Sequence, residues 1–331
     1  MAQRIAEDLW RLDIPLAGSP LKNLNSYLLT GGTRSLLIDT GFRLPECLAA
    51  MERELAETGV CRERMDVFLT HLHSDHAGLA PQLLRGDGQI YISGRDAEGL
   101  AACQTDAYWR RMYASYAENG FPEEELAELW DTNSAKTAGP SDWDGACVRL
   151  ADGDVLRRGG SELRCVLTPG HTPGHMCLYD AARRRLFSGD HILFHITPNI
   201  CRWTTMPDAL GSYLESLDRV RELPVELLLP AHRSETGVLR ERVDELKAHH
   251  ARRLDATLRA VTEHPGLTAC AVAGLTPWRI RSRSWAEFPP MQRFFAVGET
   301  LAHLDYLALR GRVRSERAGG KIVYLPTENG N

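Results

Sequence analysis

The sequence predicts an α+β fold, with a large N-terminal domain that carries a helical insertion and a smaller C-terminal domain of helices and one hairpin. Short apolar strands between residues 25 and 229 are followed by polar, Gly/Pro-rich turns. Residues 96–140 change to helical periodicity, and beyond Gly237 the chain is helical until a final pair of strands. We therefore expect a large domain over 1–237, with its insertion at about 96–140, and a C-terminal domain over 238–331.

The first elements alternate short strands with one helix. Residues 25–30 and 34–39 predict two strands joined by a tight turn at Gly31 and Gly32. Residues 44–59 carry apolar side chains at helical spacing and end at a glycine, which is typical of a helix. Two further short strands are expected at 66–70 and 89–93.

The insertion is rich in aromatic residues. Tyr108, Met112 and Tyr116 recur every four residues, which indicates one face of a helix, and a second, acidic helix is expected to begin near Pro122. Two interpretations fit these helices, a hairpin with a small core of its own or a cap over the active site, and both can hold together. In the second case Tyr108, Met112 and Tyr116 would contact the substrate.

The second half of the chain again begins with strands and ends with helices. Strands are expected at 163–168, 176–179, 185–187 and 226–229. Helices are expected at 238–263, 268–275 and 291–310, and the arms 312–315 and 321–325 flank a turn at Gly319 and Gly320. Three helices followed by a hairpin are the winged-helix arrangement.

Composition argues against a membrane protein and against a disulfide-rich secreted domain. No apolar run reaches the roughly 18 residues of a membrane helix, and residues 1–10 lack the apolar stretch of a signal peptide. Eight cysteines occur without a CxxC pair, which is typical of reduced thiols in the cytoplasm. The net charge of −5 is unevenly distributed along the chain, because residues 240–331 carry 15 Lys/Arg against 10 Asp/Glu.

A dense group of metal-binding side chains lies in the segment Thr70-His-Leu-His-Ser-Asp-His76, where the strand 66–70 ends. Because residues i and i+2 leaving a strand point the same way, His71 and His73 can bind one ion together. Asp75 and His76 follow on the turn and can face a second position. Imidazole nitrogen and carboxylate oxygen suit zinc or iron.

Further ligands must come from other segments, and three motifs that follow predicted strands offer them. TPGHTPGH contains His171 and His175, SGDH contains Asp190, and LPAH ends at His232. A single histidine after a strand is more often structural than a ligand. The joint occurrence of the three motifs at strand ends is what makes them candidates.

These motifs carry a family resemblance. HLHSDH, PGHTPGH, SGD and PAH, preceded by LLIDTG, resemble the metallo-β-lactamase superfamily, including its glyoxalase II and lactonase branches, over about residues 20–235. The resemblance implies an αββα sandwich with a two-metal site at one edge. Zinc is the default metal for both positions, although the same His/Asp donors also accept iron or manganese. The implied ligands are His71, His73 and His171 for the first ion, Asp75, His76 and His232 for the second, and Asp190 bridging both.

The resemblance also suggests residues behind the ligands. Asp39 of LLIDTG matches an acid that supports the ligands, although it is equally well placed to cap its strand. His175 matches a position that supports its loop without touching metal. His191 and His195 follow the bridging acid and either bind the oxyanion or leaving group or pack as structural residues. We favour a structural role for His191 and a catalytic one for His195.

The expected chemistry is hydrolysis by a water molecule activated between two divalent ions, oriented by Asp75. Because Asp190 is a carboxylate, the site resembles the glyoxalase II, lactonase and nuclease branches, so β-lactams are not the expected substrates. We expect a thioester or ester/lactone hydrolase acting on a small or carrier-bound acyl group. The alternatives are a single-strand endoribonuclease and a non-catalytic winged-helix regulator, and the complete ligand set argues against the regulator.

The C-terminal domain is the only feature that suggests nucleic acid. Its helix 291–310 is largely apolar and has few cations for phosphates. Basic residues instead gather in two other segments of the domain, where they either form solvated surface or contribute to a homodimer contact. They are Arg279, Arg281, Arg283, Arg312, Arg314, Arg317 and Lys321.

Overall fold

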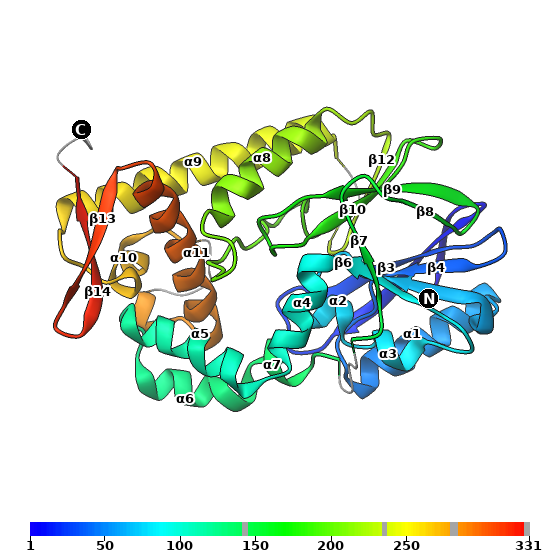
Figure 1. Ribbon diagram of the computed structural model, residues 1–331, viewed down its shortest axis with the longest axis horizontal. Coiled ribbons are helices and arrows are strands. Elements are labelled where there is room, and N and C mark those ends of the chain that lie inside the picture. Colours follow the sequence, from blue (N-terminus) through cyan, green and yellow to red (C-terminus); the bar gives the residue numbers. More distant parts are fainter. Residues whose placement is uncertain (141–144, 234–236, 279–283, 328–331) are drawn as a thin grey trace.

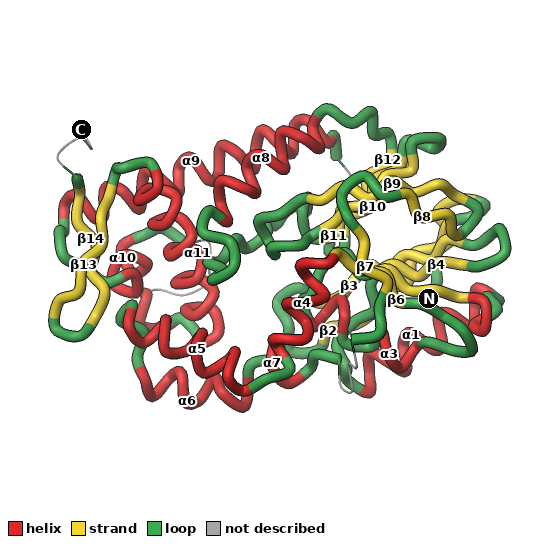
Figure 2. Tube along the Cα trace, in the orientation of Figure 1, coloured by secondary structure: helices red, strands yellow, loops and turns green. Residues whose placement is uncertain are grey.

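A computed structural model of the chain describes residues 1–140, 145–233, 237–278 and 284–327 (Figure 1). Arg279, Arg281 and Arg283 of the predicted basic group lie outside the described residues. Figure 2 shows the strands of two large sheets gathered in one half of the molecule, whereas α5, α6, α10 and α11 lie in the other half.

The first sheet has seven strands in sequence order. Strands β1 to β4 pair antiparallel, and β4 to β7 pair parallel. The predicted strands 25–30, 34–39, 66–70 and 89–93 all belong to this sheet, whereas β1, β2 and β7 were not predicted. The strands are β1 (Gln3–Ala6), β2 (Leu9–Leu16), β3 (Lys22–Leu29), β4 (Ser35–Ile38), β5 (Met65–Phe68), β6 (Ile90–Ser93) and β7 (Val148–Leu150).

The second sheet has five strands in the order β12-β11-β10-β9-β8. Strands β8 to β11 pair antiparallel, and β12 runs parallel to β11. All four strands predicted in this half of the chain are present. The strands are β8 (Val155–Arg158), β9 (Ser161–Leu167), β10 (Met176–Asp180), β11 (Arg185–Gly189) and β12 (Leu227–Pro230).

The two sheets face each other, and helices cover their outer faces. The apolar side chains between the sheets come from both, for example Leu36 and Phe68 from the first and Leu178 and Phe187 from the second. Helices α1 (Pro45–Thr58), α2 (Ser74–Ala77) and α3 (Ala80–Leu83) pack on the outer face of the first sheet. Helix α8 (Ala209–Arg221) and the start of α9 (Leu239–Glu263) pack on that of the second. The expected αββα sandwich is therefore confirmed.

The insertion forms four helices, but it has no separate core of its own. Trp109, Tyr113 and Tyr116 pack with Val297 and Leu301 of the C-terminal helices in one continuous apolar cluster. The expectation of a self-contained hairpin is therefore wrong, because the apolar face of the insertion is buried against residues almost 200 positions later in the chain. The helices are α4 (Gly94–Cys103), α5 (Asp106–Glu118), α6 (Glu123–Thr132) and α7 (Ser134–Thr137).

The C-terminal segment follows the predicted order of three helices and a hairpin. The central part of α11 is buried, as its apolar sequence predicted, so this helix offers no surface for a nucleic-acid groove. The winged-helix assignment stays a prediction. The elements after α9 are α10 (Ala269–Leu275), α11 (Pro290–Leu309), β13 (Val313–Ala318) and β14 (Lys321–Pro326).

Two expectations from composition can be compared with the structure. All eight cysteines fall within the described residues and are free thiols. Among the described residues, no helix combines the length and the apolar character that crossing a membrane requires.

Candidate metal centre

The four predicted ligands between His71 and His76 lie where the chain passes from β5 to the short helix α2. His71 and His76 are fully buried, and Asp75 is 8% exposed. His71 Nε2 lies 3.0 Å from His73 Nδ1, so the two imidazoles converge as the i, i+2 spacing predicted. Asp75 and His76 point from the first turn of α2 toward a neighbouring position.

The other predicted ligands reach the same edge of the sandwich from the ends of three strands. His171 follows β9, Asp190 follows β11 and His232 follows β12, and all three are buried. The glycine before Asp190 is required, because Gly189 has φ 49° and a Cβ there would lie 2.7 Å from His175 Nε2. The strand-end signal in the sequence therefore placed these side chains correctly.

The side chains form overlapping groups that could hold metal ions. One group is His71, His73 and His171, and another is Asp75, His76 and His232. Asp190 lies between them. Its Oδ1 is 3.6 Å from His76 Nε2 and 3.3 Å from His232 Nε2, whereas its Oδ2 is 3.5 Å from His171 Nε2.

The donor atoms fit a divalent metal ion. Ligands at 2.0–2.2 Å in a tetrahedron are separated by about 3.3–3.6 Å, and the donor separations around Asp190 fall in or beside this range. Within the described part of the chain, four of these buried atoms have no hydrogen-bond partner, a costly arrangement unless a cation binds them. They are His76 Nε2, His171 Nε2, Asp190 Oδ1 and His232 Nε2.

The local electrostatics also favour cations. Burial lowers the pKa of His71 and His73, and the pKa of His171 is lowered for the same reason, so these imidazoles are neutral and able to bind metal. Burial would also lower the pKa of His76, but the carboxylates of Asp39, Asp75 and Asp190 raise it to about 10. This part of the site therefore holds an excess of negative charge, which a proton or a metal ion can balance.

Partners outside the donor group fix the orientation of four imidazoles. Each binds a neighbouring oxygen through Nδ1, which turns Nε2 inward and is the arrangement expected of ligating histidines. The pairs are His71 with Thr70 Oγ1 at 3.0 Å, and His76 with Asp39 Oδ2, His171 with Asn199 O and His232 with Asn23 O, each at 2.8 Å.

Asp39 lies behind the donors, as the resemblance suggested. Besides His76, its carboxylate accepts hydrogen bonds from the backbone N–H and the hydroxyl of Thr70, each at 2.8 Å. Its φ of 60° is left-handed, a conformation that Asp adopts more readily than most residues. Asp39 therefore connects the end of β4 to the start of the His71–His76 turn.

The three remaining predicted histidines have different surroundings. His175 Nε2 accepts a hydrogen bond from the backbone N–H of Asp190 at 3.2 Å, so His175 supports the loop of that carboxylate. His191 is fully buried beside the ring of Tyr213. His195 is exposed, with φ 65°, and does not belong to the described donor groups or to the cavity wall described below. A catalytic role for His195 stays a prediction.

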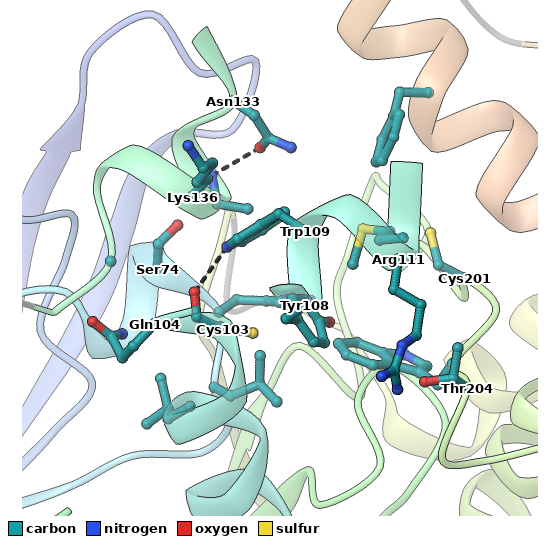
Figure 3. A pocket seen from close by; sticks show the side chains of 18 of the residues that line it. Ser74, Cys103, Gln104, Tyr108, Trp109, Arg111, Asn133, Lys136, Cys201 and Thr204 are labelled. Carbon is teal, nitrogen blue, oxygen red and sulfur yellow. Dashed lines mark hydrogen bonds between the residues drawn. The ribbon is translucent and has the colours of Figure 1, made fainter. Parts of the chain in front are cut away.

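A cavity of about 640 Å³ includes His73 in its wall and therefore opens beside the donor groups. Figure 3 draws part of its lining, including Tyr108, Trp109 and Arg111 from α5. The predicted substrate-contacting residues Tyr108, Met112 and Tyr116 all line it. Helix α11 contributes Phe294, Phe295 and Leu301 to the wall, and the ring of Phe294 stacks on Tyr116 with centroids 4.0 Å apart and planes 5° apart. A pocket of this size and apolar character suits a small organic ligand.

A sequence model of the metallo-beta-lactamase superfamily matches residues 21–232, which is more than half of the chain. The chain belongs to the metallo-beta-lactamase superfamily. A second model, described as the metallo-beta-lactamase-like C-terminal domain, matches residues 286–326. The divalent-metal chemistry of the superfamily agrees with the donor groups.

The chain is also similar to two named proteins and to one solved structure. It is 28% identical to the Beta-lactamase-like protein 2 homolog of Caenorhabditis elegans, over 79% of this chain and 74% of that protein. It is 26% identical to the Atrochrysone carboxyl ACP thioesterase of Aspergillus fumigatus, over 73% of this chain but only 45% of that longer protein. The crystal structure of a metallo-beta-lactamase family protein from Thermus thermophilus covers 98% of this chain and is itself covered fully, with 29% identity and a TM-score of 0.78. The chain is a hydrolase of this superfamily.

Two residues that contact the candidate metal centre or its loops were not predicted from the sequence. Trp203 lines the cavity, stacks on His73 with centroids 6.1 Å apart, and donates from Nε1 to the backbone oxygen of His171 at 3.1 Å. Asp96 is fully buried and accepts hydrogen bonds from Leu72 N, Thr172 Oγ1 and Gly174 N. Asp96 follows β6, so the strand-end signal could have found it, whereas no motif marks Trp203.

We expect Asp96→Asn to loosen both ligand loops, because the amide offers one oxygen to three donors. The free energy of unfolding should fall by about 1–3 kcal/mol, and metal affinity should fall about 10- to 100-fold. Chemical denaturation of the metal-free protein and competition with a chelating dye would measure the two effects. Unchanged metal affinity would show that Asp96 stabilises the fold without positioning the ligands.

The pH dependence of the same variant gives a second measurement. Burial raises the pKa of Asp96 from 3.8 to about 6, although its three hydrogen bonds oppose this. The folded state therefore binds the proton more tightly than the unfolded state between these two pKa values, and this contribution to stability is lost as pH rises through the interval. The stability difference between the wild type and Asp96→Asn should narrow from pH 4 to pH 7.

A separate group of potential ligands lies between α9 and α11. His249, His250 and Glu299 offer donor atoms close to one another. Arg253 Nε lies 3.6 Å from Glu299 Oε1, so a guanidinium already supplies positive charge there. We assign no metal ion to this group.

Proposed function

We propose that the chain is a binuclear metal-dependent hydrolase whose substrates are thioesters, with esters and lactones as related substrates. The observation that carries this proposal is the position of Asp190, which directs one carboxylate oxygen toward each group of histidines. A carboxylate in this position suits two cations about 3.5–4 Å apart, the spacing of two-metal hydrolases.

The proposed ligands are those of the sequence-based hypothesis. They supply nitrogen and oxygen donors without a cysteine, a set that suits zinc and also accommodates iron or manganese. Purification without added metal followed by elemental analysis would identify the native ion. The first ion would be held by His71, His73 and His171, the second by Asp75, His76 and His232, and both by Asp190.

Two divalent cations at this position would supply Lewis-acid activation of water and of the scissile carbonyl group. The side chains of the protein would orient the reactants. Asp75 faces His232 Nε2 at 3.4 Å and is placed to direct the attacking water, and Asp39 and Thr70 hold the imidazoles in position from behind. No Ser or Cys nucleophile is required.

The cavity favours acyl compounds over nucleic acid. Its wall contains the rings of Tyr108, Trp109, Tyr116 and Phe294, which suit an apolar acyl group. One relative is named as an ACP thioesterase, which supports a small or carrier-bound acyl thioester as the substrate. Since the chain spans less than half of that relative, the thioester substrate is our proposal for this chain.

Endoribonuclease activity has weaker support. Cations of the C-terminal hairpin have partners within the protein, for example Arg314 with Glu316, Arg317 with Glu118 and Lys321 with the backbone oxygen of Ala117. Phosphate binding by these cations would compete with the pairs that they already form. We therefore place acyl hydrolysis first.

An assay of the metal-loaded protein against an aryl thioester, a lactone and a short single-stranded RNA would test the proposal. We expect turnover of the thioester, loss of this turnover after chelation, and its recovery when metal is restored. RNA cleavage without acyl hydrolysis would contradict the proposal. Absence of all turnover with two bound ions would favour the regulator hypothesis.

A further inference from the structure

The lining of the cavity beside the candidate metal centre contains more cationic than anionic side chains. Among its described lining residues, one carboxylate faces four cationic side chains. A cation that other residues already neutralise has little affinity left for a ligand, so the partners of each one must be considered. The carboxylate is Asp106, and the cations are Arg43, Arg111, Lys136 and Arg202.

Two of the cations are held by neighbouring side chains. Arg202 donates from two nitrogens to the carboxylate of Asp305, which forms a bidentate ion pair. Lys136 Nζ lies 4.1 Å from the centroid of the Trp130 ring and 3.9 Å from the carboxylate of Asp106. Both cations therefore already have favourable partners.

A third cation is fixed by the backbone. Arg43 donates from Nε to the oxygen of Gly139 at 2.8 Å and from Nη2 to the oxygen of Thr137 at 2.9 Å. These bonds tie the loop after β4 to the end of the insertion. Arg43 therefore already has hydrogen-bond partners in the protein and a structural role.

Arg111 differs from the other three. It extends from α5 toward Thr204 at the edge of the cavity (Figure 3). No hydrogen bond or ion pair joins it to any residue that the structure describes. The residue before Thr204 is Trp203, which contacts both His73 and His171. The guanidinium therefore lies beside the loop that contacts the metal centre.

We propose that Arg111 is an anion-binding position of the cavity, and that the substrates are thioesters which carry an oxyanion in addition to the reacting carbonyl. This inference rests on the proposed thioesterase function and restricts the proposed substrates to thioesters with a second, anionic group. A carboxylate on the acyl group matches the planar guanidinium best, because the two can form paired hydrogen bonds. The phosphate of a carrier arm has the same chemistry and is a second source of the anion.

The alternative for Arg111 is a solvated surface arginine without a ligand. Exposed arginines commonly need no partner, and such a residue would not discriminate between charged and neutral substrates. A charge-assisted hydrogen bond to the substrate would instead change specificity by about 10- to 100-fold. The two alternatives therefore predict different ratios of kcat/KM between anionic and neutral substrates.

Matched substrates with the metal-loaded enzyme would test the inference. The first pair is an aryl N-acetylcysteamine thioester with a carboxylate or with a carboxamide at the same ring position. The second pair is a neutral acyl group on 4′-phosphopantetheine or on pantetheine. Arg111→Gln should lower kcat/KM about 10- to 100-fold for the anionic member of one pair, and leave its neutral member unchanged. The pair that responds identifies the source of the oxyanion.

Arg110→Gln is the matched control. Arg110 precedes Arg111 on α5, is 74% exposed, lies 3.9 Å from Asp106 and does not line the cavity. Its replacement should leave the ratio of kcat/KM between the anionic and the neutral member unchanged in both pairs. Arg111→Lys should retain part of the preference for the anionic member. An equal loss on neutral and anionic thioesters in Arg111→Gln would overturn the inference, as would a wild type without anion preference in either pair.

A binding measurement separates this inference from the proposed function. Titration of the metal-loaded protein with the free aryl dicarboxylic acid and with its carboxamide, followed by tryptophan fluorescence, requires no turnover. If no thioester is hydrolysed, the proposed function fails, and weaker binding of the diacid alone by Arg111→Gln still supports the anion position. If thioesters are hydrolysed but Arg111→Gln binds and hydrolyses the anionic and neutral members of both pairs as the wild type does, only the anion position fails.

Discussion

In the Asp190→Ala variant, kcat/KM for thioester hydrolysis is expected to fall about a thousandfold or more. The substitution removes several kcal/mol of charge stabilisation, which corresponds to about three powers of ten in rate. Asp190 is the carboxylate whose two oxygens face different groups of histidines. Without it, both proposed ions lose a ligand at once. Metal content should fall below two ions per chain, as measured by elemental analysis after gel filtration.

A buried carboxylate at the opposite end of the second sheet provides the control. Asp180 ends β10 and bonds with Ser161 and Arg183, far along the strand from the ligand loops. Asp180→Ala should lower stability without changing metal content. If Asp190→Ala retained two ions and lost less than tenfold in kcat/KM, the bridging role would be wrong.

The second large effect is expected from Phe294→Ala. Phe294 is 5% exposed, stacks on Tyr116 and contacts the edges of Tyr113 and Phe121. Removing a buried ring of this kind costs about 3–5 kcal/mol in the free energy of unfolding. Because the same ring forms the cavity wall, the KM for an aryl thioester should rise as well. Denaturant titration and steady-state kinetics would measure the two changes.

The neighbouring residue Phe295 provides a variant that distinguishes an effect on substrate binding from an effect on stability. Phe295 also lines the cavity but is 44% exposed. Phe295→Ala should therefore raise the KM with little change in the free energy of unfolding. If neither variant changed the KM for any aryl thioester, the cavity would not be the acyl site.

The metal centre could be predicted from the sequence because its donors occupy strand ends within short motifs. His71, His171 and His232 each follow a strand that apolar patterning revealed, and the loops then converge at one edge of the sandwich. Strands β1 and β2 were overlooked because the first residues of the chain are polar, and β2 alternates buried with exposed side chains only in part. Local patterns therefore located the donors better than they located the edge of the first sheet.

The contacts that complete the site depend on residues far apart in the chain. Asp96 bonds to Thr172 and Gly174, which lie 76 and 78 positions away. The stack of Tyr116 on Phe294 joins the insertion to α11, and no periodicity within either helix indicates its partner. This is also why the insertion was expected to form its own core. Its apolar face was visible in the sequence, but the surface that covers it was not.

The order of the segments along the chain has a consequence for biosynthesis. The last proposed metal ligand is His232, whereas the cavity wall is completed by Phe294, Phe295 and Leu301. During translation, all proposed metal ligands therefore emerge from the ribosome before the residues that close the acyl pocket. The proposed metal site could therefore be filled before the proposed acyl pocket is closed.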